Sequence, residues 1–143
     1  MILLVEDESG ITDLVYNLKV IGYEMKWVSN IYDAVYYITK KPGHETFNAI
    51  ILDWSMSPDG LPDEAMQTAR ETYAGIAFYR HVLNISPRLQ SRTIMLTGYA
   101  GMKKTILDKY DIQDVTIIDK IDENYQDKII KKLRGWGIYP KKI

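Results

Sequence analysis

Short, continuously apolar runs alternate along the chain with longer segments in which apolar residues recur at helical spacing. The runs are the length of buried β-strands. The expected strands cover residues 2–5, 23–28, 47–53, 93–97 and 115–118. The expected helices cover residues 11–21, about 30–38, a long region that ends near 84, 102–110, and a last helix from 122. Because apolar strands separated by helices are covered on both faces, the pattern predicts an α/β fold. We expect one doubly wound domain with a five-stranded parallel sheet and helices on both faces.

Composition narrows the class of protein further. The chain has 143 residues, of which 46% are hydrophobic and 26% charged, as in a single globular domain. A net charge of −1 argues against direct nucleic-acid binding, and the absence of cysteine excludes disulfides and thiolate metal sites. No apolar run is long enough to span a membrane, and "MILLVEDE" does not resemble a signal peptide. We therefore expect a cytoplasmic protein, with the domain over residues 1–134 and a tail over 135–143.

Polar residues stand where the expected strands end. Glu6 and Asp7 follow the first strand, Asp53 ends the third, Thr97 ends the fourth and Lys120 follows the fifth. In a parallel sheet these ends share one edge, where ligands bind. Carboxylates packed together raise one another's pKa or require a cation, and Mg²⁺ is a hard ion that prefers oxygen ligands. The set suits an aspartate that accepts a phosphoryl group beside a metal ion and an ammonium group.

Four motifs give the chain a family resemblance. "ILLVEDE", "AIILDWSM", "TIMLTGYA" and "IIDK", in this order, resemble the receiver domain of two-component response regulators, the CheY-like family. The resemblance covers the chain except for an insertion near residues 59–74. It implies a flavodoxin-like sheet with strand order 2-1-3-4-5.

The resemblance also implies residue roles and partners. Asp53 matches the phosphoacceptor, and Thr97 and Lys120 match the residues that bind the phosphoryl group. For the metal ion, Mg²⁺ (or Mn²⁺), Asp7 matches a direct ligand, Glu6 a ligand that acts through water, and Ser55 a ligand through its backbone carbonyl. The donor would be a sensor histidine kinase or a phosphotransfer protein, and the output a change in binding to an unidentified protein. Such a domain assists its own phosphorylation and autodephosphorylation but is not otherwise an enzyme. A homodimer through the fourth helix, fifth strand and fifth helix is compatible with the family, whereas a nucleic-acid or membrane partner is not expected.

The insertion is the largest departure from the family pattern. "PDEA" suits a helix start, because Pro62 fits a first turn and Asp63 and Glu64 favour its positive end. We predict an extra helix, one that can be continuous with the next. It can be a surface elaboration, or a lid or partner surface that alters access to Asp53.

Other departures concern the switch residues. Ile117 stands where receivers often carry an aromatic ring that moves on activation, and Ile121 stands where they usually carry proline. Gly98 fits the small residue expected after Thr97, and Tyr99 occupies a position that, like Ser55, tunes loss of the phosphoryl group.

Two other functions stay open at this stage. Each acid taken alone could simply favour a helix start, and a degenerate receiver would act as a phosphorylation-independent interaction module. A phosphatase of the haloacid dehalogenase type needs a second aspartate two residues after the nucleophile, where this chain has Ser55.

Overall fold

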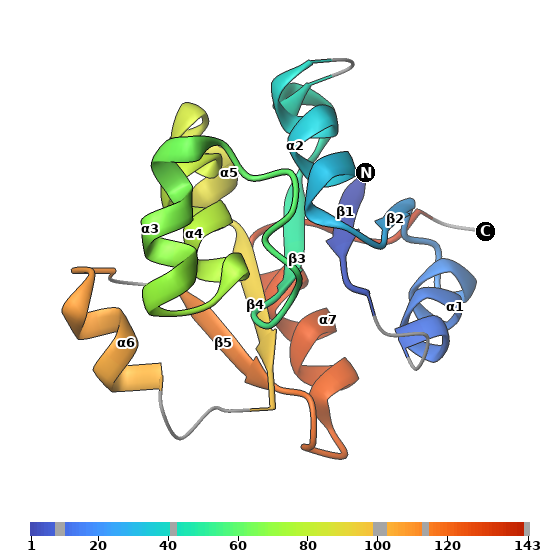
Figure 1. Cartoon of the computed structure of the whole chain (residues 1–143). Helices are drawn as coiled ribbons and strands as arrows, with labels where there is room; N and C mark the ends of the chain where they lie inside the picture. Colours follow the sequence, from blue (N-terminus) through green and yellow to red (C-terminus); the bar gives the residue numbers. More distant parts are fainter. Residues whose placement is uncertain (8–10, 41–42, 99–102, 113–114, 142–143) are drawn as a thin grey trace.

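The computed structural model describes residues 1–7, 11–40, 43–98, 103–112 and 115–141. Five strands form one parallel sheet in the order β2-β1-β3-β4-β5, which confirms the predicted fold class and strand order (Figure 1). The strands are β1 (Ile2–Val5), β2 (Met25–Val28), β3 (Ala49–Asp53), β4 (Thr93–Thr97) and β5 (Thr116–Asp119).

The register of the sheet brings the predicted polar residues to one edge. Val5 pairs with Leu52, so Glu6 begins level with Asp53 at the carboxyl ends of β1 and β3. Thr97 pairs with Asp119 at the corresponding ends of β4 and β5.

Helices cover both faces of the sheet. They are α1 (Thr12–Val20), α2 (Ile31–Thr39), α3 (Asp63–Glu71), α4 (Ala74–His81), α5 (Pro87–Gln90), α6 (Lys103–Lys109) and α7 (Tyr125–Gly135), with 3₁₀ turns η2 (His44–Thr46) and η3 (Leu83–Ile85). Buried residues of α1 and α7 share one apolar cluster, and those of α2 to α6 share another. None of the helices in the described ranges is long and apolar enough to cross a membrane.

Strand alternation divides the core between the two faces. Ile2 and Leu4 of β1 pack on the α1 and α7 side, and Leu3 and Val5 pack on the other side. All four side chains are buried, because β1 lies between β2 and β3 and is covered on both faces. The carboxyl end of β1 is therefore packed on both sides.

The insertion forms the predicted extra helix, α3, but α3 is not continuous with α4. It ends at Glu71, and α4 begins at Ala74. The break is needed because the backbone N–H of Gly75 donates to the carbonyl of Trp54 at 3.0 Å, which brings the chain back to the end of β3. A Cβ on Gly75 would lie 2.4 Å from the carbonyl oxygen of Asp53, so only glycine allows this close approach.

The long helical region predicted up to residue 84 is therefore several shorter helices. Helix α5, which we did not predict, follows it. Ser86 accepts a hydrogen bond from the backbone N–H of Leu89 at 3.2 Å, and Pro87 occupies the first turn. This is a capping signal that sequence analysis could have used.

The segment after α7 packs back onto the domain. The backbone N–H of Lys141 donates to the carbonyl of Gly22 at 3.0 Å, and the Tyr23 hydroxyl donates to the carbonyl of Ile138 at 2.9 Å. Gly22 has φ +109°, and a Cβ there would lie 2.3 Å from the Lys141 carbonyl oxygen. The tail is thus fastened beside the start of β2, at the sheet edge opposite the carboxyl ends.

Candidate functional site

Three carboxylates meet at the carboxyl edge of the sheet. Glu6, Asp7 and Asp53 each offer an oxygen, and these oxygens lie within 4.8 Å of one another. The side chains of Glu6 and Asp53 are almost completely buried, and Asp7 is exposed. The cluster is therefore open to solvent on the Asp7 side and closed by protein beneath Asp53.

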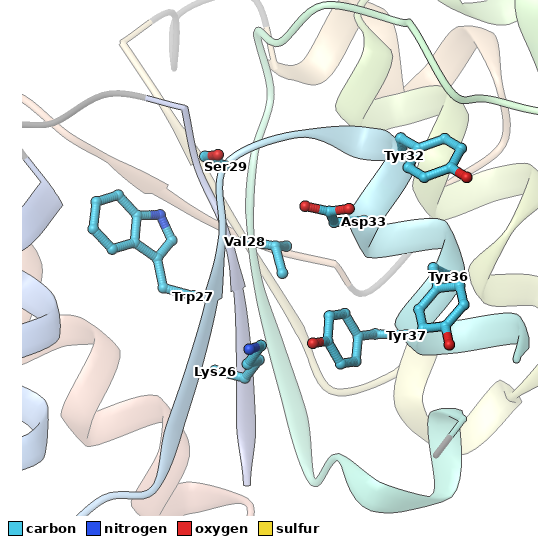
Figure 2. A pocket seen from close by; sticks show the side chains of 8 residues that line it. All are labelled: Lys26, Trp27, Val28, Ser29, Tyr32, Asp33, Tyr36 and Tyr37. Atoms are coloured by element: carbon cyan, nitrogen blue, oxygen red, sulfur yellow. The ribbon is translucent and has the colours of Figure 1, made fainter. Parts of the chain in front are cut away.

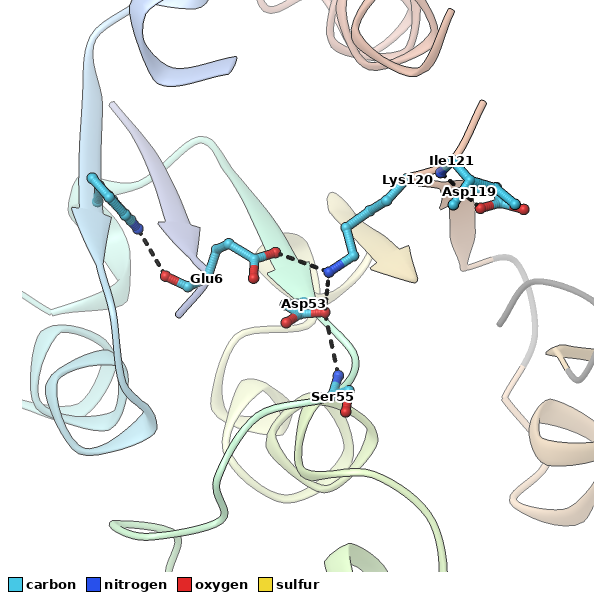
Figure 3. Close-up of polar contacts among 7 residues, drawn as sticks. Glu6, Asp53, Ser55, Asp119, Lys120 and Ile121 are labelled. Atoms are coloured by element: carbon cyan, nitrogen blue, oxygen red, sulfur yellow. Dashed lines mark hydrogen bonds and ion pairs between the residues drawn. The ribbon is translucent and has the colours of Figure 1, made fainter. Parts of the chain in front are cut away.

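Lys120 places an ammonium group between two of these acids (Figure 3). Its Nζ lies 3.2 Å from Asp53 Oδ1 and 3.5 Å from Glu6 Oε2. The backbone N–H of Lys120 donates to the carbonyl of Thr97 at 3.0 Å, which fixes the residue at the end of β4. The lysine reaches the cluster although isoleucine occupies the next position, and the backbone N–H of Ile121 donates to the Asp119 carboxylate at 3.0 Å.

The two oxygens of Asp53 have different surroundings. Oδ1 accepts from Lys120 and, at 3.3 Å, from the backbone N–H of Ser55. Oδ2 is buried and has no hydrogen-bond partner among the described residues. A buried carboxylate oxygen without a partner is costly. Its position among three carboxylates fits a hard divalent cation such as Mg²⁺.

The electrostatics of Asp53 follow from its burial. Burial raises the pKa of the Asp53 carboxyl above its ordinary value. Hydrogen bonding with the Glu6 carboxyl, the charge of the Lys120 ammonium and the Ser55 backbone N–H oppose this rise in the pKa. Because the effect of burial prevails, the ionised form of Asp53 is disfavoured in this site, and a bound cation would stabilise it.

The remaining predicted residues lie at different distances from this cluster. Thr97 ends β4 with 1% of its surface exposed, and Gly98 is exposed with open space where a Cβ would stand. Ile117 is half-buried and packs with the cluster beneath α2 to α6, and Ile121 is 80% exposed. Tyr99 lies outside the described residues.

Sequence reasoning missed one contact of the site. The indole N–H of Trp27, on β2, donates to the backbone carbonyl of Glu6 at 2.8 Å. No local pattern links two residues that far apart in the chain; only the pairing of β1 with β2 brings them together.

A separate hollow of about 410 Å³ lies between β2 and α2 (Figure 2). It is lined by Lys26, Trp27, Val28, Ser29, Tyr32, Asp33, Tyr36 and Tyr37. The Lys26 ammonium lies 5.0 Å from the centre of the Tyr37 ring, a cation–π distance. None of the three clustered carboxylates lines this hollow, so it is distinct from the acidic cluster.

The same fold occurs in solved receiver domains. A CheY-like receiver domain protein from Methanospirillum hungatei JF-1 has a TM-score of 0.64 and 21% identity, covering 95% of this chain and 94% of that chain. The Thermotoga maritima response regulator TrrA, solved in complex with Mg²⁺ and BeF, has a TM-score of 0.58 and 20% identity, covering 92% and 97%. A Burkholderia pseudomallei response regulator with a phosphorylated aspartic acid, a calcium ion and citrate has a TM-score of 0.63 and 19% identity, covering 92% and 65%.

These likenesses establish that the chain has the fold of response regulator receiver domains. No sequence-family model matches the chain, and no curated protein matches it in sequence. The residues that the resemblance singled out therefore draw their support from the geometry of this structure.

Proposed function

We propose that the protein is a phosphorylation-dependent signalling switch of a two-component phosphorelay, acting in the cytoplasm. It accepts a phosphoryl group on Asp53 from the phosphohistidine of a sensor histidine kinase or phosphotransfer protein. One observation carries the proposal: in the buried Asp53 carboxylate, Oδ2 has no hydrogen-bond partner among the described residues, while Oδ1 lies 3.2 Å from the Lys120 ammonium, and two further carboxylates stand beside it.

The chemistry is a transfer between two nucleophiles. An oxygen of Asp53 attacks phosphorus, the O–P bond forms as the P–N bond of phosphohistidine breaks, and the leaving imidazole takes a proton from solvent. Mg²⁺, when bound, would neutralise charge on the transferred oxygens. Asp7, Asp53 and the Ser55 carbonyl would hold the ion, with Glu6 acting through water.

The residues of the chain then respond to the new charge. A phosphoryl group adds about −1.5 to −2 charges near neutral pH. Lys120 already stands beside Asp53 to pair with it, and the Thr97 hydroxyl would donate a hydrogen bond from the neighbouring strand. Because Lys120 and Thr97 adjoin β5 and the segment that leads to α6, we propose that the surface of α6, β5 and α7 changes its binding to an output protein or to a second copy.

The Thermotoga and Burkholderia structures support this chemistry by likeness of fold. One is a complex with Mg²⁺ and BeF, and the other contains a phosphorylated aspartic acid and a calcium ion. The acidic cluster of this chain offers carboxylate oxygens, which hard divalent cations prefer as ligands.

Phosphorylation by a small donor tests the proposal. We expect acetyl phosphate with Mg²⁺ to add one phosphoryl group to the intact protein, as measured by mass spectrometry. The Asp53→Asn variant should not gain this mass, whereas Asp59→Asn, which alters an exposed acid of the following loop, should gain it. No gain in the wild type would favour a phosphorylation-independent interaction module, and a gain that persists in Asp53→Asn would place the modification elsewhere.

A further inference from the structure

The acidic segment after β1 is held by two consecutive residues of the edge strand β2. The backbone N–H of Glu6 donates to the carbonyl of Val28 at 3.1 Å, and the Glu6 carbonyl accepts from the indole N–H of Trp27 at 2.8 Å. Glu6 lies one residue beyond the end of β1, and its N–H still bonds to the backbone of β2. Its carbonyl accepts from a side chain of the same strand, the indole of Trp27.

This bond acts directly on the next residue. The Glu6 carbonyl and the Asp7 nitrogen belong to one planar peptide unit, so a bond that fixes the carbonyl oxygen also fixes the direction in which the Asp7 Cα leaves. Asp7 is exposed, in contrast to the buried Glu6 and Asp53. Its place in the cluster depends on its backbone more than on side-chain packing.

We propose that Trp27 is a positioning residue for the metal site: its indole N–H holds the peptide between Glu6 and Asp7 so that both carboxylates face Asp53. The inference rests on the proposed function, because it concerns the same Mg²⁺ site. It adds a residue on a different strand and predicts that Mg²⁺ affinity depends on one hydrogen bond outside the carboxylate cluster.

The indole ring has a packing role that can be separated from its hydrogen bond. Trp27 is half-buried and packs against the apolar cluster of α1 and α7. Figure 2 shows its side chain leaving β2 on the side opposite to Lys26 and Val28. Replacing Trp27 with phenylalanine keeps an aromatic ring in this cluster and removes the donor, together with part of the ring volume, for which a second Trp→Phe variant in the same cluster serves as the control.

The closing experiment measures Mg²⁺ binding by ¹H–¹⁵N NMR, with Mg²⁺ alone as the ligand. A net hydrogen bond of ordinary strength corresponds to roughly a 2- to 10-fold change in a binding constant. We expect Trp27→Phe to weaken Mg²⁺ binding by this factor. Trp136→Phe, which alters another half-buried tryptophan packed against the same cluster, should leave the affinity unchanged.

A second readout needs no variant. In the wild type, the Trp27 indole N–H signal should exchange slowly with water and should shift as Mg²⁺ binds, since its acceptor belongs to the Asp7 peptide unit. This measurement decides the question even if Trp27→Phe fails to fold.

The outcomes separate the two proposals. Equal Mg²⁺ affinity in Trp27→Phe and the wild type, or an indole signal that neither shifts nor is protected, would overturn the positioning role and leave the proposed function intact. No Mg²⁺ binding by the wild type at millimolar concentrations would overturn both.

Discussion

The hydroxyl of Tyr110 donates a hydrogen bond to Glu71 Oε2 at 2.6 Å and so joins the end of the inserted helix α3 to the residue that follows α6. The Lys109 ammonium lies 3.8 Å from the same oxygen, and the Arg80 guanidinium lies 4.9 Å from the centre of the Tyr110 ring. The insertion thereby contacts an element of the surface that we propose to respond to phosphorylation.

Tyr110→Phe removes this hydrogen bond and keeps the ring. We expect backbone amides of α6 to exchange with solvent severalfold faster at neutral pH, because the end of the helix loses its hydrogen bond to α3. Hydrogen-exchange mass spectrometry measures this, with the exposed Tyr16→Phe as the matched control. The hydrogen bond lowers the pKa of Glu71. The stabilisation is therefore present above the ordinary carboxyl pKa and is lost as pH falls through the lowered value. Equal exchange in α6 at neutral pH would contradict the coupling.

Asp53→Asn should stabilise the metal-free protein at neutral pH. Burial raises the pKa of Asp53, so its contribution to stability is present below the ordinary carboxyl pKa and is lost as pH rises through the raised value. Asparagine does not ionise, so the variant does not lose this stability as the pH rises. Thermal denaturation without Mg²⁺ should show a melting temperature several degrees higher at pH 7, since about 1 kcal/mol corresponds to roughly 3–6 °C in a domain of this size. The gain in melting temperature should vanish near pH 3, where the Asp53 carboxyl is protonated. A variant less stable than the wild type at pH 7 would show that the attraction of Lys120 outweighs the effect of burial.

Lys120→Gln should have the opposite effect. It leaves the buried Glu6 and Asp53 carboxylates facing each other without the ammonium group that lies 3.5 and 3.2 Å away from them. We expect the free energy of unfolding without Mg²⁺ to fall by about 2–3 kcal/mol near neutral pH, less than the roughly 3–5 kcal/mol for a fully buried pair. Urea denaturation at pH 7.5 and pH 5 should show a smaller loss at the lower pH, where a carboxyl can be protonated.

The matched control for this variant is Lys128→Gln. Lys128 pairs with Asp122 at the exposed start of α7, and such surface pairs contribute little. A loss of stability in Lys128→Gln as large as that in Lys120→Gln would mean that the effect is one of net charge.

Gly75→Ala should disturb the end of β3. The added Cβ would lie 2.4 Å from the Asp53 carbonyl oxygen and 2.9 Å from Trp54 Cα, both backbone atoms that cannot turn aside. We expect a loss of about 1–3 kcal/mol in urea denaturation, together with weaker Mg²⁺ binding. Gly135→Ala, at the end of α7, has no heavy atom within 4 Å of the added Cβ and should change stability by less than about 1 kcal/mol. Equal stability of the two variants would contradict the close approach at Gly75.

The strand ends explain why much of the site could be anticipated from the sequence. Asp53 and Thr97 terminate apolar runs that can only be buried strands, and parallel strands end together. The alternation of strands and helices was equally clear. The prediction of the helices was weakest after Asp53. Ala65, Ala69 and Tyr73 follow one another at helical spacing, although the backbone turns after Glu71 to reach Trp54.

Contacts between distant parts of the chain had no such signal. The bond from Trp27 to Glu6 depends on the register of β2 against β1, and the bond from Tyr110 to Glu71 depends on how α3 packs beside α6. Both follow from tertiary packing, which local propensity does not encode.

The return of the chain from Gly75 to Trp54 has a practical consequence. The excursion between these residues is a loop whose two ends are fastened at one hydrogen bond, 3.0 Å long, beside Asp53. Since the entropy of closing a loop costs only about 0.6 kcal/mol more for each doubling of its length, a peptide tag grafted near the exposed Ser57 or Asp59 should leave the carboxylate in place. This turn is therefore a suitable point at which to attach a reporter close to the reactive edge of the sheet.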